Sequence, residues 1–167
     1  MASISFIFTL LMIVSTIIIP NSTRGGETIK TTVKGSLVFG KTTINYNDGV
    51  AVTGIFDGVS KTIVYLTDKM GDRNEIIKGL LKNGSYGSTS NRLELSFDPK
   101  GNLKYYFFYL REAGRDQNVG KAPENIKSET TLAKNQVKGH VVVQKPLEVF
   151  DKKYTFDVTF HVENVTK

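Results

Sequence analysis

The last long stretch of the chain alternates apolar and polar residues one by one, and this pattern constrains the fold more than any other feature. Between Tyr154 and Glu163, five apolar side chains fall on one face of an extended strand and five polar side chains fall on the other. Successive side chains of a β-strand point to opposite faces, so the segment predicts a strand with one buried and one solvated face. Strands of this kind are typical of antiparallel sheets.

The same alternation recurs along most of the chain after residue 30. Turn signals such as Asn47-Asp48-Gly49 and Asp98-Pro99-Lys100-Gly101 separate the alternating segments. The predicted strands span residues 31–39, 42–46, 51–56, 61–67, 92–98, 103–110, 126–132, 136–143 and 154–163. We therefore predict an all-β, mainly antiparallel fold of about eight or nine strands, either a β-sandwich or a partly closed barrel.

One segment departs from the strand pattern and predicts a short helix near residues 72–82. Its apolar side chains form a single stripe at helical spacing: Ile76, Ile77, Leu80 and Leu81. Asp72 can cap the first turn, and Asn83-Gly84 ends the helix. Gly79 weakens it by about 1 kcal/mol relative to alanine, so we expect the helix to depend on packing against the sheet. We expect residues 85–90 and 112–124 to be exposed loops.

Five consecutive aromatic residues, Tyr105-Tyr106-Phe107-Phe108-Tyr109, lie within the predicted strand 103–110. They cannot all contact one ligand, because alternate residues of a strand point to opposite faces. Aromatic faces can stack on sugars or bases. We nevertheless expect this strand to sit centrally in the sheet, with both of its faces contributing to the core.

The N-terminus has the composition of a targeting segment. Residues 4–19 are almost wholly apolar, a run of about 16 residues that is short of the ~20 needed to span a bilayer. We predict a cleaved signal peptide over residues 1–26 and a single β-rich domain over 27–167, with no membrane span after cleavage. The protein would then be secreted, or periplasmic in the cell envelope. A retained N-terminal anchor is the alternative, because no Lys or Arg precedes the apolar run.

The charge and the cysteine count exclude several classes of function. The chain has 22 Lys and Arg against 16 Asp and Glu, and its basic residues are scattered, which argues against a nucleic-acid partner. The excess predicts solubility and weak attraction to anionic surfaces. The absence of cysteine excludes a disulfide framework, thiolate catalysis and Cys-based zinc sites. Asn-x-Ser/Thr triplets, which accept glycans only in a eukaryotic secretory route, begin at Asn21, Asn83 and Asn164.

Three residues are candidates for a metal site. His140 and His161 lie on the outward faces of two predicted strands, and Asp157 shares the face of His161. If the two strands paired, these side chains could approach one another and hold a divalent metal. The other interpretation, which we adopt, is that both histidines are solvated. Since the chain has only two histidines, a three-histidine site is impossible.

Hydrolytic acid–base chemistry needs two carboxylates at a set distance in a cleft. Four carboxylates on predicted outward strand faces are candidates: Glu94, Asp98, Asp157 and Glu163. Surface acids are mostly solvated, so we interpret them as part of a charged exterior. We predict no catalytic residue, no metal site and no cofactor.

Short motifs spread over residues 33–163 resemble a group of bacterial exported domains of unknown function. These motifs are Gly35-Ser-Leu37, Tyr65-Leu-Thr-Asp68-Lys69, the helix 76–81, Phe97-Asp98-Pro-Lys-Gly101, Val137-Lys-Gly139-His140 and Phe150-Asp-Lys-Lys-Tyr154-Thr-Phe156-Asp157-Val-Thr-Phe160. Members of the group often carry a His-Ala-Tyr-Ala-like segment in the second strand, where this chain has Val50-Ala-Val-Thr53. Any role of that histidine is therefore absent here. The resemblance implies an all-β fold and export, and it implies no activity.

The favoured functional interpretation is a non-catalytic exported module that binds an unknown partner, which would be a protein, a glycan or an anionic surface. One alternative is a metal- or carboxylate-dependent hydrolase centred on His140, His161 and Asp157. The other is a small-molecule carrier, which would require the strands to close into a barrel with a cavity.

Overall fold

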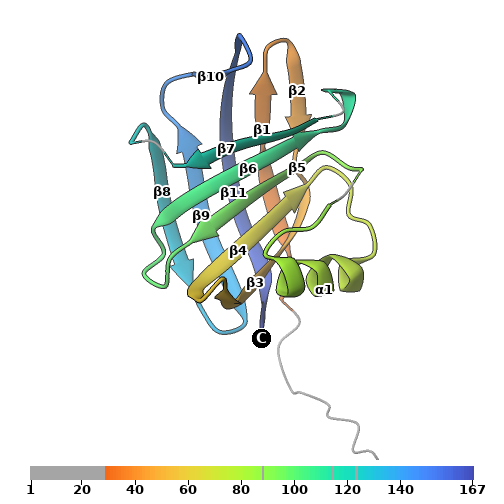
Figure 1. Ribbon diagram of the computed structural model, residues 1–167, viewed down its shortest axis with the longest axis vertical. Helices are drawn as coiled ribbons and strands as arrows, with labels where there is room; N and C mark the ends of the chain where they lie inside the picture. Colours follow the sequence, from red (N-terminus) through yellow and green to blue (C-terminus); the bar gives the residue numbers. More distant parts are fainter. Residues whose placement is uncertain (1–28, 88, 114, 123) are drawn as a thin grey trace, which may run out of the picture.

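The computed structural model of the chain describes residues 29–87, 89–113, 115–122 and 124–167, apart from the side chains of residues 113–120. The predicted signal peptide and Asn21 lie outside the described residues. The described residues form eleven strands and one α-helix, which are labelled in Figure 1. Their order is β1 (Thr32–Phe39), β2 (Thr42–Asn45), β3 (Asp48–Phe56), β4 (Val59–Thr67), α1 (Arg73–Asn83), β5 (Arg92–Phe97), β6 (Leu103–Leu110), β7 (Arg115–Lys121), β8 (Ile126–Leu132), β9 (Gln136–Val143), β10 (Leu147–Val149) and β11 (Lys152–Thr166).

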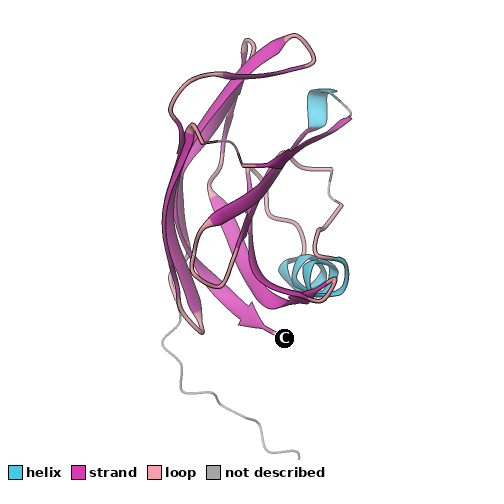
Figure 2. Cartoon of the chain, turned by 60° about the vertical axis from the view of Figure 1, so that its left-hand side comes forward, coloured by secondary structure: helices cyan, strands magenta, loops and turns pink. Residues whose placement is uncertain are grey.

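The strands form two layers that face each other (Figure 2). Sheet A contains β2, β1, β11, β9 and β8, with β10 paired to the start of β11, and sheet B contains β3 to β7. The long strand β11 belongs to both layers. Most of it pairs antiparallel with β1 and β9, and its last residues, from Asn164 to Thr166, pair parallel with β3. In the described chain the result is an open mixed sheet folded over on itself, which is not closed into a barrel.

The predicted fold class is confirmed: the described part of the chain is mostly β, with one short α-helix. Two strands were missed by the sequence prediction. β7 occupies part of the segment expected to be a loop, and β10 is only three residues long. β7 begins with the polar run Arg-Asp-Gln-Asn, so it carries no period-2 hydrophobic signal, and its antiparallel pairing with β6 places it at an edge of sheet B.

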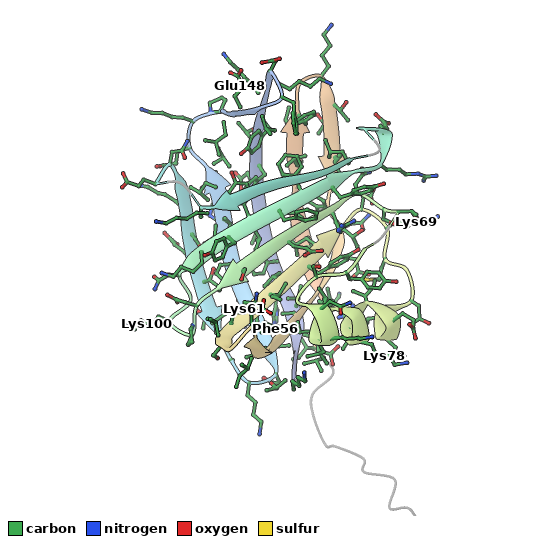
Figure 3. All side chains as sticks on the ribbon, viewed as in Figure 1. Phe56, Lys61, Lys69, Lys78, Lys100 and Glu148 are labelled. Carbon is green, nitrogen blue, oxygen red and sulfur yellow. The ribbon has the colours of Figure 1, made fainter. Side chains whose placement is uncertain are left out.

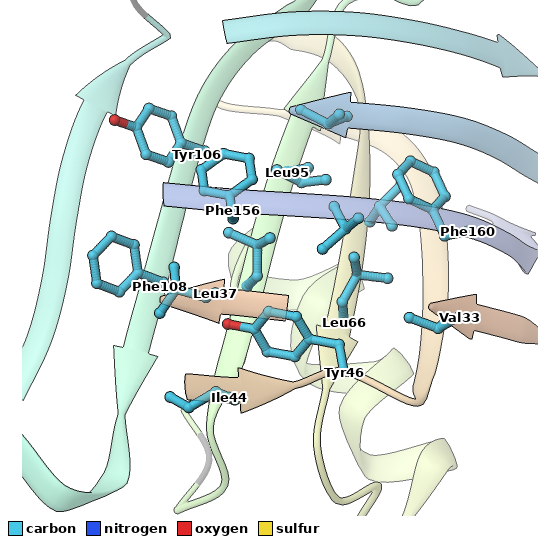
Figure 4. Close-up of a cluster of buried hydrophobic side chains, with 14 of the residues drawn as sticks. Val33, Leu37, Ile44, Tyr46, Leu66, Leu95, Tyr106, Phe108, Phe156 and Phe160 are labelled. Carbon is cyan, nitrogen blue, oxygen red and sulfur yellow. The ribbon is translucent and has the colours of Figure 1, made fainter. Parts of the chain in front are cut away.

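The space between the layers holds the main hydrophobic core (Figure 4). The face of β11 that was predicted to be buried is buried: its side chains from Tyr154 to Val162, taking every second residue, are at most 2% exposed. Ring contacts join the layers, since Tyr106 of sheet B lies 5.5 Å from Phe156 between ring centroids, and Phe108 lies 5.1 Å from Tyr154. One-sided burial of alternating residues therefore holds the two layers together.

The helix begins and ends as the sequence predicts. Asp72 Oδ1 accepts hydrogen bonds from the backbone N–H groups of Asn74 and Glu75, and the helix ends at Gly84, whose φ of 72° lies in the left-handed region. Ile76 and Leu80 are buried against the outer face of sheet B, in a second cluster whose other buried members come from β3 and β4: Val50, Val52, Phe56, Ile63 and Tyr65. The helix thus covers the outer face of β3 and β4 and leaves that of β5 and β6 uncovered (Figure 1).

Candidate functional site

The two histidines stand on the outer face of sheet A, where β11 pairs with β9. His140 Nε2 lies 2.8 Å from Asp157 Oδ1, whereas His161 Nε2 lies 2.6 Å from the side-chain oxygen of Gln136. The structure therefore brings His140 and Asp157 together and engages His161 elsewhere. His140 and Asp157 are exposed, at 45% and 68% of their side-chain surface. Among the described residues, no group of three His, Cys, Asp or Glu side chains is placed to hold a metal ion.

The four candidate carboxylates lie in four separate places. Glu163 bonds to Arg73, with 3.5 Å between the guanidinium nitrogen and the carboxylate oxygen, and Asp157 lies beside His140 on the same strand face. Glu94 lies on the other sheet. Asp98 accepts hydrogen bonds within the turn between β5 and β6, and the side-chain amide of Asn102 is the main cause that lowers the pKa of this carboxyl below its usual range. Each carboxylate has a structural partner of its own.

A groove lies on the outer face of sheet B, beside the helix, and is the candidate functional site. Its volume is about 390 Å³, near the lower end of the roughly 300–1,000 Å³ range of small-molecule sites. Strands β4, β5 and β6 form its floor and one wall, and the segment after α1 forms the opposite rim. The lining residues are Lys61, Ile63, Gly84, Ser85, Gly87, Arg92, Glu94, Ser96, Tyr105, Tyr106 and Phe107.

The aromatic wall of the groove comes from the alternation along β6. Tyr106 and Phe108 point inward and are buried in the core, as expected. Tyr105, Phe107 and Tyr109 point to the outer face, where Tyr105 is 57% exposed and the other two are half-buried. The expectation that both faces of this strand belong to the core is therefore wrong for the outer face. The physical reason is that α1 packs on β3 and β4 and does not reach β6.

A buried ion pair fixes the floor. Arg92 and Glu94 lie two residues apart on β5, so both side chains reach the same face, where Arg92 Nε and Glu94 Oε1 are 3.1 Å apart. Their side chains are only 5% and 8% exposed. The guanidinium also lies over two rings of β6, 5.0 Å from the centroid of Phe107 and 4.8 Å from that of Tyr109. Paired in this way, the two charges hold the rings of the wall in place.

The rim after the helix is ordered by a glycine. A Cβ atom on Gly79 would come within 2.3 Å of the Tyr86 ring, so only glycine lets this ring lie against the helix. The Tyr86 ring makes an edge contact with the Tyr65 ring. The backbone N–H of Tyr86 donates a hydrogen bond to Glu94 Oε1 at 3.5 Å. The helix-weakening glycine predicted from sequence thus serves to dock the rim onto the floor of the groove.

A larger hollow, of about 530 Å³, opens between β2 and the ends of β4, β5 and β6. Its polar side chains connect strand ends. Asn91 Nδ2 donates to Asp68 Oδ2 at 2.6 Å, and Asn91 Oδ1 accepts from the backbone N–H of Arg111 at 2.8 Å. These bonds tie the end of β4 to the end of β6, which is a structural role. We therefore place the candidate site at the groove, whose exposed ring and hydroxyl groups face solvent.

Two of the glycosylation triplets can be compared with the structure. Asn164 is 8% exposed, and its side-chain amide donates to the carbonyl of Ala133 at 2.9 Å. A buried, hydrogen-bonded amide is not available to a glycosyltransferase in the folded protein. Asn83 is exposed at the end of α1.

Sequence reasoning named Glu94 and the aromatic run without predicting the groove. A signal was present in β5, where polar Arg92, Glu94 and Ser96 alternate with apolar residues and so share the face of Tyr105 and Phe107 across the strand pair. Comparisons with known protein families, with curated proteins and with solved structures found no match to this chain. No helix in the described part of the chain combines the length and the apolar composition needed to cross a membrane.

Proposed function

We propose that the protein is a non-catalytic binding module, exported to the cell envelope or beyond, and that the groove on sheet B binds a glycan. The observation that carries this proposal is the exposed ring of Tyr105 beside Phe107, in a groove that also holds the hydroxyl groups of Ser85 and Ser96. The partner class is one of the three expected from the sequence.

The chemistry of a sugar matches this arrangement. A pyranose ring has an apolar face of C–H bonds, which packs on an aromatic ring, and an edge of hydroxyl groups, which need polar partners. In the groove the apolar face would lie on Tyr105, and the hydroxyl edge would meet Ser96, Ser85 and Lys61. The buried Arg92–Glu94 pair keeps the wall rigid, and a rigid site loses less conformational entropy on binding.

The two alternative functions fit the structure less well. A carboxylate-dependent hydrolase needs two carboxyl groups flanking one bond, and Glu94 is the only carboxylate among the lining residues that the structure describes. A carrier needs a closed barrel with a cavity, whereas the described strands form an open sheet with a packed core. Binding without catalysis remains the function that the geometry favours.

The test is a binding screen followed by one substitution. Soluble oligosaccharides of glucose, N-acetylglucosamine, galactose and mannose would be titrated by calorimetry. Tyr105→Ala should weaken the tightest of them roughly tenfold, since a ring contact and its buried area are worth about 1.4 kcal/mol or more. Tyr105→Phe should keep most of the affinity.

The matched control is Phe150→Ala, which removes an aromatic side chain of similar exposure, 65%, between β10 and β11. It should leave binding unchanged. Absence of binding by all four sugar series, or equal losses in the Tyr105 and Phe150 variants, would overturn the proposal.

A further inference from the structure

The hairpin formed by β3 and β4 projects beyond its own sheet. β3 pairs with β11 only as far as Thr53, and β4 pairs with β5 only from Thr62 onward. Residues 54–61 therefore pair only with one another. The turn at Asp57-Gly58 has positive φ at both residues, 52° and 77°, which is the geometry of a tight two-residue hairpin. We call residues 54–61 the hairpin tip.

The hairpin tip carries the two most exposed aliphatic side chains of the described chain. Ile55 is 68% exposed and Val59 is 61% exposed. Ile55 lies opposite Ser60, and Val59 lies opposite Phe56, so the two aliphatic groups are on opposite faces of the hairpin. An isolated exposed apolar residue is ordinary. Here Ile55 and Val59 share one projecting tip, and, unlike Phe56 of the same tip, neither of them belongs to a buried cluster of the described chain.

Lysines surround the hairpin tip. The Lys61 ammonium lies 5.2 Å from the centroid of the Phe56 ring, and the backbone N–H of Lys167 donates to the carbonyl of Thr53 at 3.0 Å. Figure 3 places Lys100 at the same end of the molecule as Lys61 and Phe56. The exposed or half-buried lysines placed at this end are Lys61, Lys100, Lys134 and Lys167, and in the described part of the chain none of them forms an ion pair. The tip itself carries one exposed acid, Asp57, at its turn, so these lysines outnumber the acid of the tip four to one.

A small hollow opens between the hairpin tip and the turn that joins β8 to β9. Its volume is about 260 Å³. Two lysines, Lys61 and Lys134, share its lining with four residues that carry a hydroxyl group: Thr53, Ser60, Thr62 and Thr166. Ammonium and hydroxyl groups are donors that suit a phosphate.

We infer that this end of the molecule docks on an anionic phospholipid surface. Ile55 and Val59 insert at the level of the acyl boundary, and the surrounding lysines contact lipid phosphates. Stable attachment to a membrane surface takes two signals, and an aliphatic tip within a basic ring supplies both. A protein partner would need an interface of roughly 1,000 Å² or more, and a two-stranded tip of eight residues is a poor match for that. This inference does not depend on the glycan proposal.

The chain contains no tryptophan, so a single introduced indole reports on its own position. The protein would be purified from its own host, with the N-terminus defined by mass spectrometry, and mixed with vesicles of phosphatidylcholine alone or with 30% phosphatidylglycerol. Ile55→Trp should give a blue-shifted emission that brominated lipid quenches, only with the anionic vesicles. Phe150→Trp, at the opposite end of the molecule, should show neither effect.

Charge is tested separately. Each lysine near an anionic surface contributes about fivefold in affinity, so Lys134→Ala combined with Lys167→Ala should weaken binding to the anionic vesicles roughly 25-fold. Lys152→Ala combined with Lys153→Ala, at the start of β11, is the matched control and should have little effect. Raising the salt to about 0.5 M should weaken binding of the unsubstituted protein.

Three results would overturn the inference. They are an unshifted Ile55→Trp emission in vesicle-bound protein, equal binding to neutral and anionic vesicles, and equal losses in the two lysine pairs. Binding that depends on charge but leaves the Ile55→Trp emission unshifted would indicate a polyanion as the ligand in place of a bilayer, and this result too contradicts insertion.

Discussion

The phenol oxygens of Tyr106 and Tyr154 lie 2.5 Å apart inside the core, so one side-chain hydrogen bond joins β6 of sheet B to β11 of sheet A. Burial raises the pKa of both phenols above the usual value near 10. The folded protein therefore holds these protons at a pH where the unfolded chain releases them.

This difference predicts how stability depends on alkaline pH. The contribution is fully present below about pH 10 and is lost as pH rises above that value, because the unfolded state then binds fewer protons than the folded state. Urea unfolding at pH 8, 10 and 11 should show a fall in the free energy of unfolding. The fall should be smaller in the variant with both Tyr106→Phe and Tyr154→Phe; an identical fall would contradict the assignment.

The same pair should be non-additive at neutral pH. Tyr106→Phe leaves the buried Tyr154 hydroxyl without this partner, which costs about 1–3 kcal/mol. The double substitution removes both hydroxyl groups and should cost less than the two single substitutions added together. Unfolding free energies of the three variants measure this coupling, and strict additivity would show that the bond contributes nothing.

Large-to-small substitutions on β11 should separate its two faces. Phe156→Ala and Phe160→Ala should each lower the free energy of unfolding by roughly 3–5 kcal/mol, because both rings are buried. Thr155→Ala and Thr159→Ala, on the outer face, should stay within about 0.5 kcal/mol. Chemical denaturation gives all four values, and similar losses for the two sets would mean that burial is not one-sided.

Gly35 predicts a backbone effect. Its φ is 130°, and a Cβ atom would come within 2.0 Å of the carbonyl oxygen of Asp157 on the paired strand. Gly35→Ala should therefore cost at least about 1–3 kcal/mol from backbone strain alone. Gly71→Ala is the control, because nothing lies within 4 Å of its Cβ position. Thermal melting compares the two, and equal melting temperatures would contradict the close approach of β1 and β11.

The exposed His140–Asp157 pair should contribute little. His140→Ala and His161→Ala should each change the free energy of unfolding by less than about 1 kcal/mol, as exposed pairs do. Zinc should leave the melting temperature unchanged. Saturation at about 100 times a dissociation constant would add about 2.7 kcal/mol, so a genuine site would be visible. A zinc-dependent shift abolished by either variant would restore the hydrolase alternative.

The sequence predicts much of the fold because its strongest signal is local. The alternation from Tyr154 to Glu163 places each residue of β11 on its face, and the capping pattern around Asp72 and Gly84 sets both ends of α1. The parallel pairing of Asn164 with Ala51 has no local sequence signal, because it depends on where two segments distant in sequence meet.

The groove could not be predicted for a related reason. The alternation of β6 shows that Tyr105 and Phe107 share a face, but whether that face is covered depends on where α1 packs. An apolar stripe on a helix indicates that it packs on a sheet, without indicating on which strands. For the same reason, the sequence of β5 is equally compatible with a polar face exposed to solvent and with a polar face that forms the floor of a site.

The double membership of β11 has a consequence for biosynthesis. Thr32 at the start of β1 pairs with His161, and the strand that completes sheet A also borders β3 of sheet B, so both layers need the same 15 residues of β11. Contacts this far apart in sequence make folding slow, because the loop between them must close first. A ribosome or translocation channel that delivers β1 before β11 must therefore release every residue through β11 before either layer can be finished. Until then the incomplete layers leave the polypeptide able to pass through a channel.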